Sequence, residues 1–251
     1  MYIVDAFWSV VPGNEAKAQA ALEKLAADVE ASEPDTLFYL VHHPNLDPGV
    51  KIFPPPAATQ IAFVEGYKDR AAFLAHVAGP VFQEFVAKHG TLFLNMYGPE
   101  TPFVIVQALD LTDGFIRPES AYPGVYQVEA RWMMKPGQRE AVKEALVDYI
   151  RAVFAYEPGT YMYTASMLDL YPDSPSIPPW NADALTFNSS WKDFQAFLDH
   201  GSAAPYQDFL AAYGHLFVQA SNTSTTHPYM TTSVLKRFAG FFREKAFILA
   251  Q

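Results

Sequence analysis

Apolar and polar residues alternate over two short stretches of the chain, one at its beginning and one near its middle. The first stretch has apolar residues at every second position, at Tyr2, Val4, Ala6 and Trp8, and the other repeats them at Tyr126, Val128, Ala130 and Trp132. In the second stretch they alternate with Gln127, Glu129 and Arg131. A period of two is typical of a strand with one apolar face. Both stretches are therefore predicted to be strands, each ended by a Pro-Gly pair.

The residues after the first strand change to a helical period and then return to strands. Apolar positions recur at helical spacing over 14–31, which predicts an amphipathic helix. The Glu33-Pro34 pair ends this helix, because the residue before a proline is driven out of the α region. Two further strands are expected at 37–43 and 60–67, separated by a proline-rich loop.

A second helical segment and a fourth strand complete the unit. Asp69 can cap the start of the segment by accepting hydrogen bonds from free backbone N–H groups. The Gly79-Pro80 pair interrupts the segment, and Gly90 is expected to end it in a left-handed conformation. Residues 92–97 are then predicted to form the fourth strand.

The whole pattern recurs 124 residues later without any insertion. Of the 92 positions from 2 to 93, 32 are identical to the residue 124 positions further on, whereas average amino-acid usage gives roughly 6% identity by chance. The repeat predicts strands at 161–167, 184–191 and 216–221 and a helix cap at Asp193. The chain is thus one structural unit written twice.

The order of elements, β-α-β-β-α-β, is that of a ferredoxin-like fold. We therefore predict an α+β protein in which two tandem ferredoxin-like modules bury their open sheet faces against each other as an intrachain dimeric α/β barrel. The expected division is a first module at 1–98, a linker at 99–123, a second module at 124–221, and a loop with a C-terminal helix at 222–251. The helix is expected because Val234, Leu235, Phe238, Phe241 and Phe242 have helical spacing. It either docks on the body or, like the outer surface, serves in a homodimer interface.

Composition and charge narrow the classes of function. The chain has no cysteine, which excludes disulfides, thiolate catalysis and cysteine-ligated metal sites. A net charge of −10 without a basic run disfavours nucleic acid and anionic membranes as partners. No apolar run is long enough to span a bilayer and the N-terminus lacks the pattern of a signal peptide, so a cytoplasmic location is expected.

A motif that occurs in both copies resembles that of the antibiotic biosynthesis monooxygenase family. It consists of Glu-Pro-x-Thr-x-x-Tyr, an aromatic residue at the end of the following strand, and a histidine nine residues after that aromatic. In the second copy the motif tyrosine is Tyr163, the aromatic is Trp191 and the histidine is His200. The resemblance covers roughly residues 1–97 and 125–221. Members include cofactor-independent oxygenases of anthrones and quinols, haem-degrading enzymes and a ring-opening branch of aromatic polyketide biosynthesis.

The resemblance implies roles for the histidine and the aromatic of each copy. His200 and its first-copy equivalent His76 correspond to the histidine of the haem-degrading branch. Trp191 and its equivalent Tyr67 correspond to the aromatic that stacks on a flat substrate. Tyr163 joins these as a substrate-binding candidate. The alternative is that the histidines pack or cap the broken helix and that the aromatics fill core.

The polar residues of the strands provide a second set of candidates. If helices cover the apolar face of the strand at 126–132, Glu129 and Arg131 point into the barrel, where Arg131 would stabilise an anionic intermediate and Glu129, or its equivalent Asp5, would accept a proton. If the faces are reversed, these residues are solvated. Asn188, on a neighbouring strand, is a candidate to hydrogen-bond a quinone or phenolate oxygen. It would turn outward if the register shifted by one residue.

His42 and His43 are candidates for binding substrate in the first half. They resemble a pair of metal ligands, but adjacent strand residues point to opposite faces and cannot bind one ion without distortion. His89, His215 and His227 have no partners at ligand spacing. No metal site is therefore predicted.

The expected function is oxidation of an electron-rich aromatic, such as an anthrone, hydroquinone or related polyketide, with O₂ as cosubstrate and without a tightly bound cofactor. A reduced flavin that arrives as a diffusible cosubstrate stays open. The alternatives are a non-catalytic carrier of hydrophobic small molecules and a haem-binding or haem-degrading protein. The two copies differ at several candidate positions, among them Tyr67/Trp191 and Glu65/Ser189. This divergence predicts two unequal cavities, and the second half is the first place to look for the chemistry.

Overall fold

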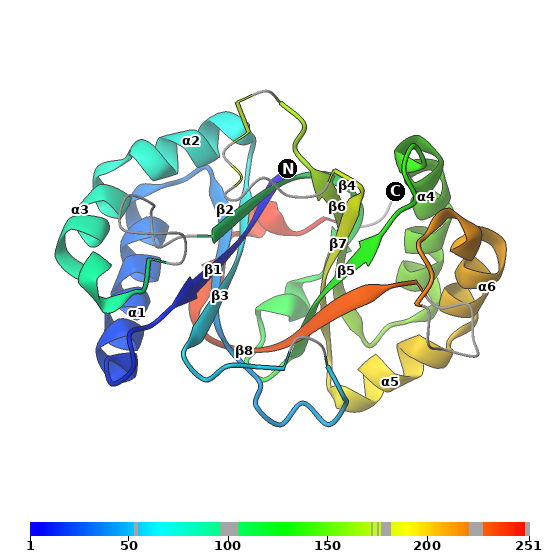
Figure 1. Ribbon diagram of the computed structural model, residues 1–251, viewed down its shortest axis with the longest axis horizontal. Coiled ribbons are helices and arrows are strands. Elements are labelled where there is room, and N and C mark those ends of the chain that lie inside the picture. Colours follow the sequence, from blue (N-terminus) through cyan, green and yellow to red (C-terminus); the bar gives the residue numbers. More distant parts are fainter. Residues whose placement is uncertain are drawn as a thin grey trace.

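The computed structural model describes residues 1–52, 55–95, 105–171, 173–174, 176, 182–220 and 228–248. Within these ranges the strands close into a barrel, and helices cover two opposite sides of it (Figure 1). The described strands are β1 (Tyr2–Ser9), β2 (Thr36–Pro44), β3 (Gln60–Tyr67), β4 (Ile105–Ile116), β5 (Tyr126–Met133), β6 (Thr160–Leu168), β7 (Ala184–Trp191) and β8 (Met230–Phe242).

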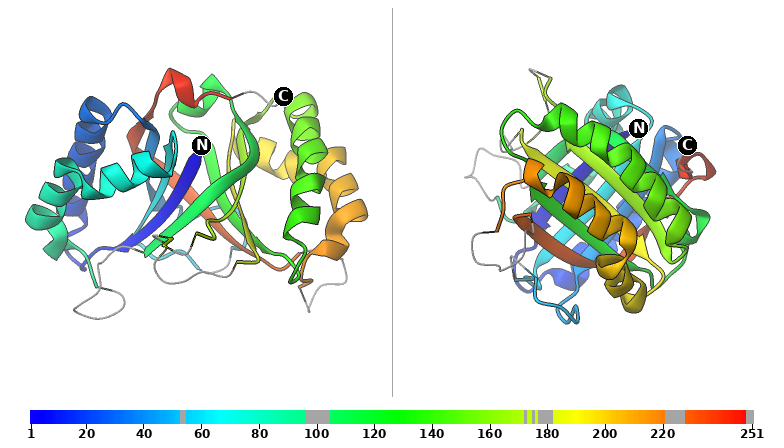
Figure 2. Two further views of the ribbon diagram at one scale, coloured as in Figure 1. Left: turned by 90° about the horizontal axis from the view of Figure 1, so that it is seen from above. Right: turned by 90° about the vertical axis from the view of Figure 1, so that its right-hand side faces the viewer.

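The helices divide between the two halves of the chain. The α-helices are α1 (Glu15–Ser32), α2 (Arg70–Ala78), α3 (Pro80–His89), α4 (Arg139–Tyr156), α5 (Phe194–Ser202) and α6 (Ala204–Tyr213). Short 3-10 turns occur at η1 (Gly90–Leu92), η2 (Pro118–Ala121), η3 (Gly214–Leu216) and η4 (Glu244–Ala246). Figure 2 shows α1, α2 and α3 on one side of the barrel and α4, α5 and α6 on the other.

The strands are ordered β1-β3-β2-β8-β5-β7-β6-β4 around the barrel. The strands of each half keep the ferredoxin-like order, and the halves join through two antiparallel seams, β2 with β8 and β6 with β4. The predicted α+β fold, with two tandem modules that form an intrachain α/β barrel, is confirmed. Joining the halves leaves the described sheet without a free edge.

The prediction for the fourth strand of each module was wrong. The true fourth strands are β4, inside the predicted linker, and β8, inside the predicted C-terminal helix. At the predicted places the chain makes η1 and η3, after which Phe93 and Phe217 form single bridges to Val10 and Met134. Residues 96–97 and 221 lie outside the described residues.

The C-terminal segment looks helical in sequence because its strand is covered on both faces. Val234 packs in the core under the second-half helices, Phe241 packs under the first-half helices, and Leu235 lies in the core inside the barrel. A strand buried on both faces loses its alternation, so its apolar residues can imitate a helical period. A homodimer through a C-terminal helix therefore falls away, whereas one through the outer surface stays a prediction.

The local signals around the second helical segment were mostly right. The side chains of Asp69 and Asp193 accept hydrogen bonds from the backbone N–H groups of Ala72 and Ala196, both at 2.9 Å. The predicted breaks separate α2 from α3 and α5 from α6. The left-handed end at Gly90 was wrong: its φ is −54°, and the chain continues into η1. None of the helices in the described ranges is both long and apolar enough to cross a bilayer.

Candidate functional site

The candidate residues separate onto the two faces of the barrel sheet. Trp191 of β7 and Tyr163 of β6 lie on the outer face, where His200 of α5 packs against them, whereas Asn188 and Glu129 are buried on the inner face. Neighbouring residues of one strand therefore belong to different cavities, because strand side chains point alternately to opposite faces of the sheet. Each face has a cavity of its own.

The outer cavity, which we call the helix-side pocket, lies between strands β5 to β8 and helices α5 and α6. Its volume is about 200 Å³. The residues that line it are Val128, Ala130, Trp132, Tyr163, Phe187, Ser189, Trp191, Phe197, Leu198, His200, Gly201, Tyr206, Met230 and Thr232. Six of these are aromatic. Such a lining favours a flat apolar ligand held by few polar groups.

His200 is held in the helix-side pocket by a carboxylate. Its Nδ1 lies 2.7 Å from Oε2 of Glu157, and the hydroxyl of Thr160 donates to the same oxygen at 3.0 Å. Because a carboxylate accepts hydrogen bonds, Nδ1 carries the proton in the neutral ring and Nε2 is left with the lone pair. Nε2 lies 3.5 Å from the hydroxyl of Tyr149. The repeated Glu-Pro-x-Thr motif therefore orients a basic nitrogen.

Aromatic rings enclose this imidazole. The ring centroid of His200 is 5.1 Å from Tyr163, 5.6 Å from Trp191 and 5.2 Å from Tyr206. The Tyr163 and Tyr149 hydroxyls are hydrogen-bonded at 2.8 Å, and burial raises the pKa of both well above the usual value for tyrosine. The indole Nε1 of Trp191 is buried and has no hydrogen-bond partner among the described residues. The pocket is thus lined by one histidine whose ring is held in place and by one tryptophan whose N–H has no hydrogen-bond partner among the described residues.

The first half repeats the histidine pair in a more filled space. Nδ1 of His76 lies 2.8 Å from Glu33. Here Glu65 occupies the position of Ser189, and its carboxylate accepts a hydrogen bond of 2.7 Å from the Tyr67 hydroxyl. Burial raises the pKa of Glu65 to about 7. The larger side chains at this place distinguish the first half from the second.

A second substitution between the halves opens space in the helix-side pocket. Gly201 stands where the first half has Val77, and a Cβ built on Gly201 would have no neighbouring atom within 4 Å. Val77 itself packs against the first-half core. The cavity of the second half therefore lies where two larger residues of the first half have become serine and glycine.

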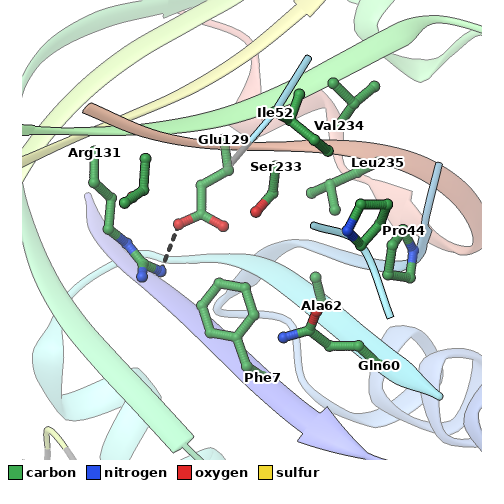
Figure 3. Close-up of a pocket in the computed structure, with 12 residues that line it drawn as sticks. Phe7, Pro44, Ile52, Gln60, Ala62, Glu129, Arg131, Ser233, Val234 and Leu235 are labelled. Atoms are coloured by element: carbon green, nitrogen blue, oxygen red, sulfur yellow. Dashed lines mark ion pairs between the residues drawn. The ribbon is translucent and has the colours of Figure 1, made fainter. Parts of the chain in front are cut away.

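The polar face of β5 points into the barrel, so the solvated alternative is wrong. Gln127 and Glu129 are 2% and 3% exposed, and Asp5 of β1 is fully buried. Figure 3 shows Glu129 and Arg131 beside Phe7 of β1 at one mouth of the barrel. This second cavity, the barrel-mouth pocket, has a volume of about 170 Å³.

The buried polar groups inside the barrel form pairs across it. The amide Nδ2 of Asn188 donates to Oδ1 of Asp5 at 2.9 Å, and Arg131 makes an ion pair of 2.5 Å with Glu129. Burial and the charge of Glu129 raise the pKa of Asp5 well above its ordinary value. Burial also raises the pKa of Glu129, although Arg131 opposes this shift.

The two adjacent histidines of β2 point to opposite faces, as predicted. Inside the barrel, Nε2 of His42 lies 2.9 Å from the side-chain oxygen of Gln127, and burial lowers the pKa of His42 to about 4. Outside, His43 stacks on Phe238 with 4.3 Å between ring centroids and contacts Gln19 at 3.2 Å. Neither histidine lines the helix-side pocket or the barrel-mouth pocket.

The described residues contain no group of three or more histidine and acidic side chains placed to hold a metal ion. His227 lies outside the described residues. The absence of a resident metal stays a prediction.

Sequence reasoning missed several residues of the helix-side pocket. Glu157 was identified only as part of a motif, although its separation of 43 residues from His200 recurs between Glu33 and His76. That repeated spacing was the signal available. Tyr206 had a similar signal, because an aromatic residue follows the histidine by six positions in both copies, as Phe82 and Tyr206. Gly201 carried none, because its importance depends on how α5 lies over the sheet.

The chain is similar to one known protein family and to several solved structures. The sequence model of the family described as antibiotic biosynthesis monooxygenase matches residues 1–88 and 125–212. No protein with a curated description matches the chain.

Several solved structures resemble the whole chain. A candidate monooxygenase of Fusobacterium nucleatum is 15% identical and has a TM-score of 0.72, with 99% of this chain and 96% of that one covered. A candidate monooxygenase of Lactobacillus acidophilus is 13% identical with a TM-score of 0.71, and the alignment covers 100% and 99% of the two chains. An anthrone oxidase-like protein is 13% identical with a TM-score of 0.55, over 100% and 95%. At these identities the likeness shows a shared fold.

Proposed function

The chain belongs to the antibiotic biosynthesis monooxygenase family, and from this premise we propose that it oxidises an electron-rich aromatic molecule with O₂ in the helix-side pocket. The observation that carries the proposal is the pair formed by Glu157 and His200 inside an aromatic cavity. Its Nδ1 contact of 2.7 Å leaves Nε2 of His200 as a base for a substrate in that cavity.

An anthrone illustrates the chemistry, because it needs no electron donor besides itself. Nε2 of His200 takes a proton from the ring CH₂ group, and the resulting enolate is stabilised by a hydrogen bond from Nε1 of Trp191 to its oxygen. The enolate passes one electron to O₂, and the substrate radical and superoxide then combine to form a carbon–oxygen bond. Loss of the second proton from that carbon breaks the O–O bond. The products are a quinone and water, so that CH₂ + O₂ gives C=O + H₂O.

The surrounding residues orient the substrate and the ring of His200, and they make the cavity apolar. Trp132 and Tyr163 line the cavity with flat rings that suit stacking on a polycyclic substrate. Glu157 holds the tautomer of His200 and stabilises the imidazolium once it has taken a proton. We assign no step in this pocket to Asn188, Glu129 or Arg131, because they lie on the opposite face of the sheet.

Haem fits this pocket poorly. Pockets that enclose drug-sized ligands have volumes of roughly 300–1,000 Å³, and a porphyrin is at least as large as such a ligand. The volume of the helix-side pocket, about 200 Å³, is below this range. We therefore derive no step through haem.

The test is O₂ consumption with anthrone in buffer treated with a metal chelator. The wild-type protein should consume one O₂ for each quinone formed. His200→Gln should lower kcat by about 10²–10⁴-fold, the range for loss of a general base. Trp191→Phe keeps an aromatic ring but removes the N–H donor, and should lower kcat more than it raises KM.

The repeat supplies matched control variants. His76→Gln and Tyr67→Phe make the equivalent changes in the first half and should affect kcat far less than His200→Gln and Trp191→Phe. If anthrone and a panel of hydroquinones bind but are never oxidised, and if His200→Gln changes only affinity, the protein is a carrier and the proposal is wrong.

A further inference from the structure

The barrel-mouth pocket lies on the opposite side of β5 and β8 from the helix-side pocket. Glu129 and Arg131 face the barrel mouth, whereas Val128 and Trp132 of the same strand face the helices. In β8, Thr231 and Ser233 line the barrel-mouth pocket, whereas Met230 and Thr232 line the helix-side pocket. Val234 departs from this alternation and also lines the barrel-mouth pocket, but no residue lines both pockets. The barrel-mouth pocket is therefore a separate cavity, which the proposed oxidation does not use.

This pocket has a polar end and an apolar end. Glu129 and Arg131 form the polar end together with Ser233, and Figure 3 shows their side chains directed toward one space. Ile52 and Leu235 belong to the apolar end, with other residues that include Pro44, Pro56 and Ala62. Two further polar residues, Gln60 and Thr231, also line the pocket. A lining of this kind suits a small molecule with an apolar body and one polar end.

The duplication is broken at this place in a way that creates the two ends. Arg131 is the equivalent of Phe7, yet the two side chains meet, with the guanidinium carbon 4.8 Å from the ring centroid of Phe7. A cation over an aromatic face is attractive and orients the guanidinium. With Phe at both positions Glu129 would lack its cation, and with Arg at both positions the mouth would carry a second positive charge. The unequal pair instead places a balanced ion pair beside an apolar ring.

The charges of the pocket decide which polar end a ligand should have. Glu129 is 3% exposed and its carboxylate is 2.5 Å from Arg131, so the polar end is an ion pair already balanced in charge. An anion would compete with Glu129 for Arg131, and a cation would compete with Arg131 for Glu129. Either would leave a buried charge without its partner, which is costly. A neutral group that donates to the carboxylate and accepts from the guanidinium leaves the pair intact.

A polar side chain next to the ion pair of Glu129 and Arg131 also lacks a hydrogen-bond partner among the described residues. Thr186 lies opposite Arg131 in the register of β5 with β7, and its hydroxyl is buried without a hydrogen-bond partner among the described residues. Buried polar atoms in native proteins are nearly always satisfied by protein, water or a ligand. The barrel interior behind the mouth is thus polar enough to hold a hydrogen-bonding guest.

We propose that the barrel mouth is a second binding site, which takes a small neutral molecule with an apolar body and an amide-like or hydroxyl end that both donates and accepts hydrogen bonds. Its donor contacts the Glu129 carboxylate, its acceptor contacts the Arg131 guanidinium, and its body lies against Phe7 and Leu235. The site does not depend on the oxidation proposed for the helix-side pocket.

Three probes with the same ring and different polar ends test the proposal. Benzamide is neutral and both donates and accepts, benzoate is an anion, and benzylammonium is a cation. Titrated into the full-length ¹⁵N-labelled protein, benzamide should bind saturably and shift the amide resonances of 60–62, 129–131 and 231–233. Benzoate and benzylammonium should bind at least tenfold more weakly.

Variants assign the binding to the barrel mouth. The double variant Glu129→Gln, Arg131→Gln removes the ion pair without leaving a lone charge and should weaken benzamide binding at least tenfold. Ala62→Leu fills the apolar side without touching the pair and should do the same, which keeps the test decisive if the double variant fails to fold. His200→Gln, in the other pocket, should leave benzamide binding unchanged.

Three results would overturn the proposal. One is the absence of saturable binding by any probe, and another is equal binding of the charged probes and benzamide. The third is a set of shifts confined to 197–206, which would place benzamide in the helix-side pocket. Because none of these measurements follows oxidation, failure of the second site is distinguishable from failure of the proposed function.

Discussion

Asn188 of β7 donates a hydrogen bond of 2.9 Å to Asp5 of β1 across the interior of the barrel, although the two residues are 183 positions apart in the chain. Each comes from a different half, so the bond ties the halves together at their centre. The other carboxyl oxygen of Asp5 has no hydrogen-bond partner among the described residues. Burial raises the pKa of Asp5, and the bond from Asn188 partly opposes this shift.

This bond should appear as a coupling between two substitutions. Asn188→Ala and Asp5→Ala should each lower the free energy of unfolding by about 1–3 kcal/mol, because each leaves a buried polar group without its partner. The double variant should cost at least about 0.5 kcal/mol less than the sum of the single changes. Urea denaturation followed by tryptophan fluorescence measures all three. As a control, the changes in the free energy of unfolding caused by Asn188→Ala and by a substitution of the exposed Asp208 should be additive. If the changes caused by Asn188→Ala and Asp5→Ala were also additive, the bond would contribute nothing to stability.

Glu65 should make stability depend on pH. Burial raises its pKa from 4.5 to about 7 in the folded protein, so the folded state binds the proton more tightly than the unfolded state. Stability from this group is therefore complete below pH 4.5 and is lost as the pH rises through about 7. The loss should reach about 3 kcal/mol at pH 8 and above.

The matched variant for this effect is Glu65→Gln, which cannot ionise. Its free energy of unfolding should change less than that of the wild type between pH 5 and pH 8, and it should be the more stable protein at pH 8. Glu84→Gln, at an exposed position, should follow the wild-type curve. Parallel curves for the wild type and Glu65→Gln would rule out a raised pKa at Glu65.

Substitutions of Gly201 should change the volume of the helix-side pocket without lowering the stability of the protein. A Cβ at this helical position meets no atom within 4 Å, so Gly201→Ala should stabilise the protein by about 0.5–1 kcal/mol through helix propensity. Gly201→Val restores the first-half residue and should weaken anthrone binding at least tenfold without unfolding the protein. Binding by fluorescence quenching and thermal unfolding report the two effects. Unchanged anthrone affinity in Gly201→Val would place the ligand elsewhere.

Gly240 should be indispensable to the seam between β2 and β8. Its φ is +120°, and a Cβ there would lie 2.0 Å from the backbone oxygen of Tyr39. Gly13 also has a positive φ, +89°, but has open space around it. Gly13→Ala should therefore cost about 1–2 kcal/mol from backbone strain alone. Gly240→Ala should cost a further 1–3 kcal/mol or more, as expected for overpacking, and equal thermal shifts for the two variants would contradict the close approach.

The sequence predicted most of the local structure and the division into two copies. The strand ranges 60–67 and 184–191 were exact in both halves, because flanking turn residues and aligned copies define them twice. The alternation in β5 placed Glu129 on the face opposite Val128 and Trp132, although it did not decide which of the two faces points into the barrel. The Glu-Pro-x-Thr motif and the spacing to His200 were visible as well, although the carboxylate contact they serve was not.

The fourth strands could not be found in the same way. Both β4 and β8 pack at one end against the core under the first-half helices and at the other end against the core under the second-half helices, while their inner faces contribute to the core inside the barrel. Both faces of each strand therefore carry apolar residues, and the period of two is lost. In 234–242 the remaining pattern agreed equally well with a helix. Strand pairing with the other half, which is non-local, decides between the two.

By itself, the sequence determined the duplication, the order of the first three strands and the helices in each copy, and the residue types at the candidate sites. These depend on local propensity and periodicity, which neighbouring residues encode. Only the tertiary structure decided that His200 and Asn188 serve opposite faces of one sheet, that Gly201 opens a pocket, and that Asn188 meets Asp5. The first two depend on how α5 and α6 lie over the sheet of the second half. The third arises when β4 and β8 close the barrel, because closure brings together Asp5 and Asn188, which are 183 positions apart and which no local pattern relates.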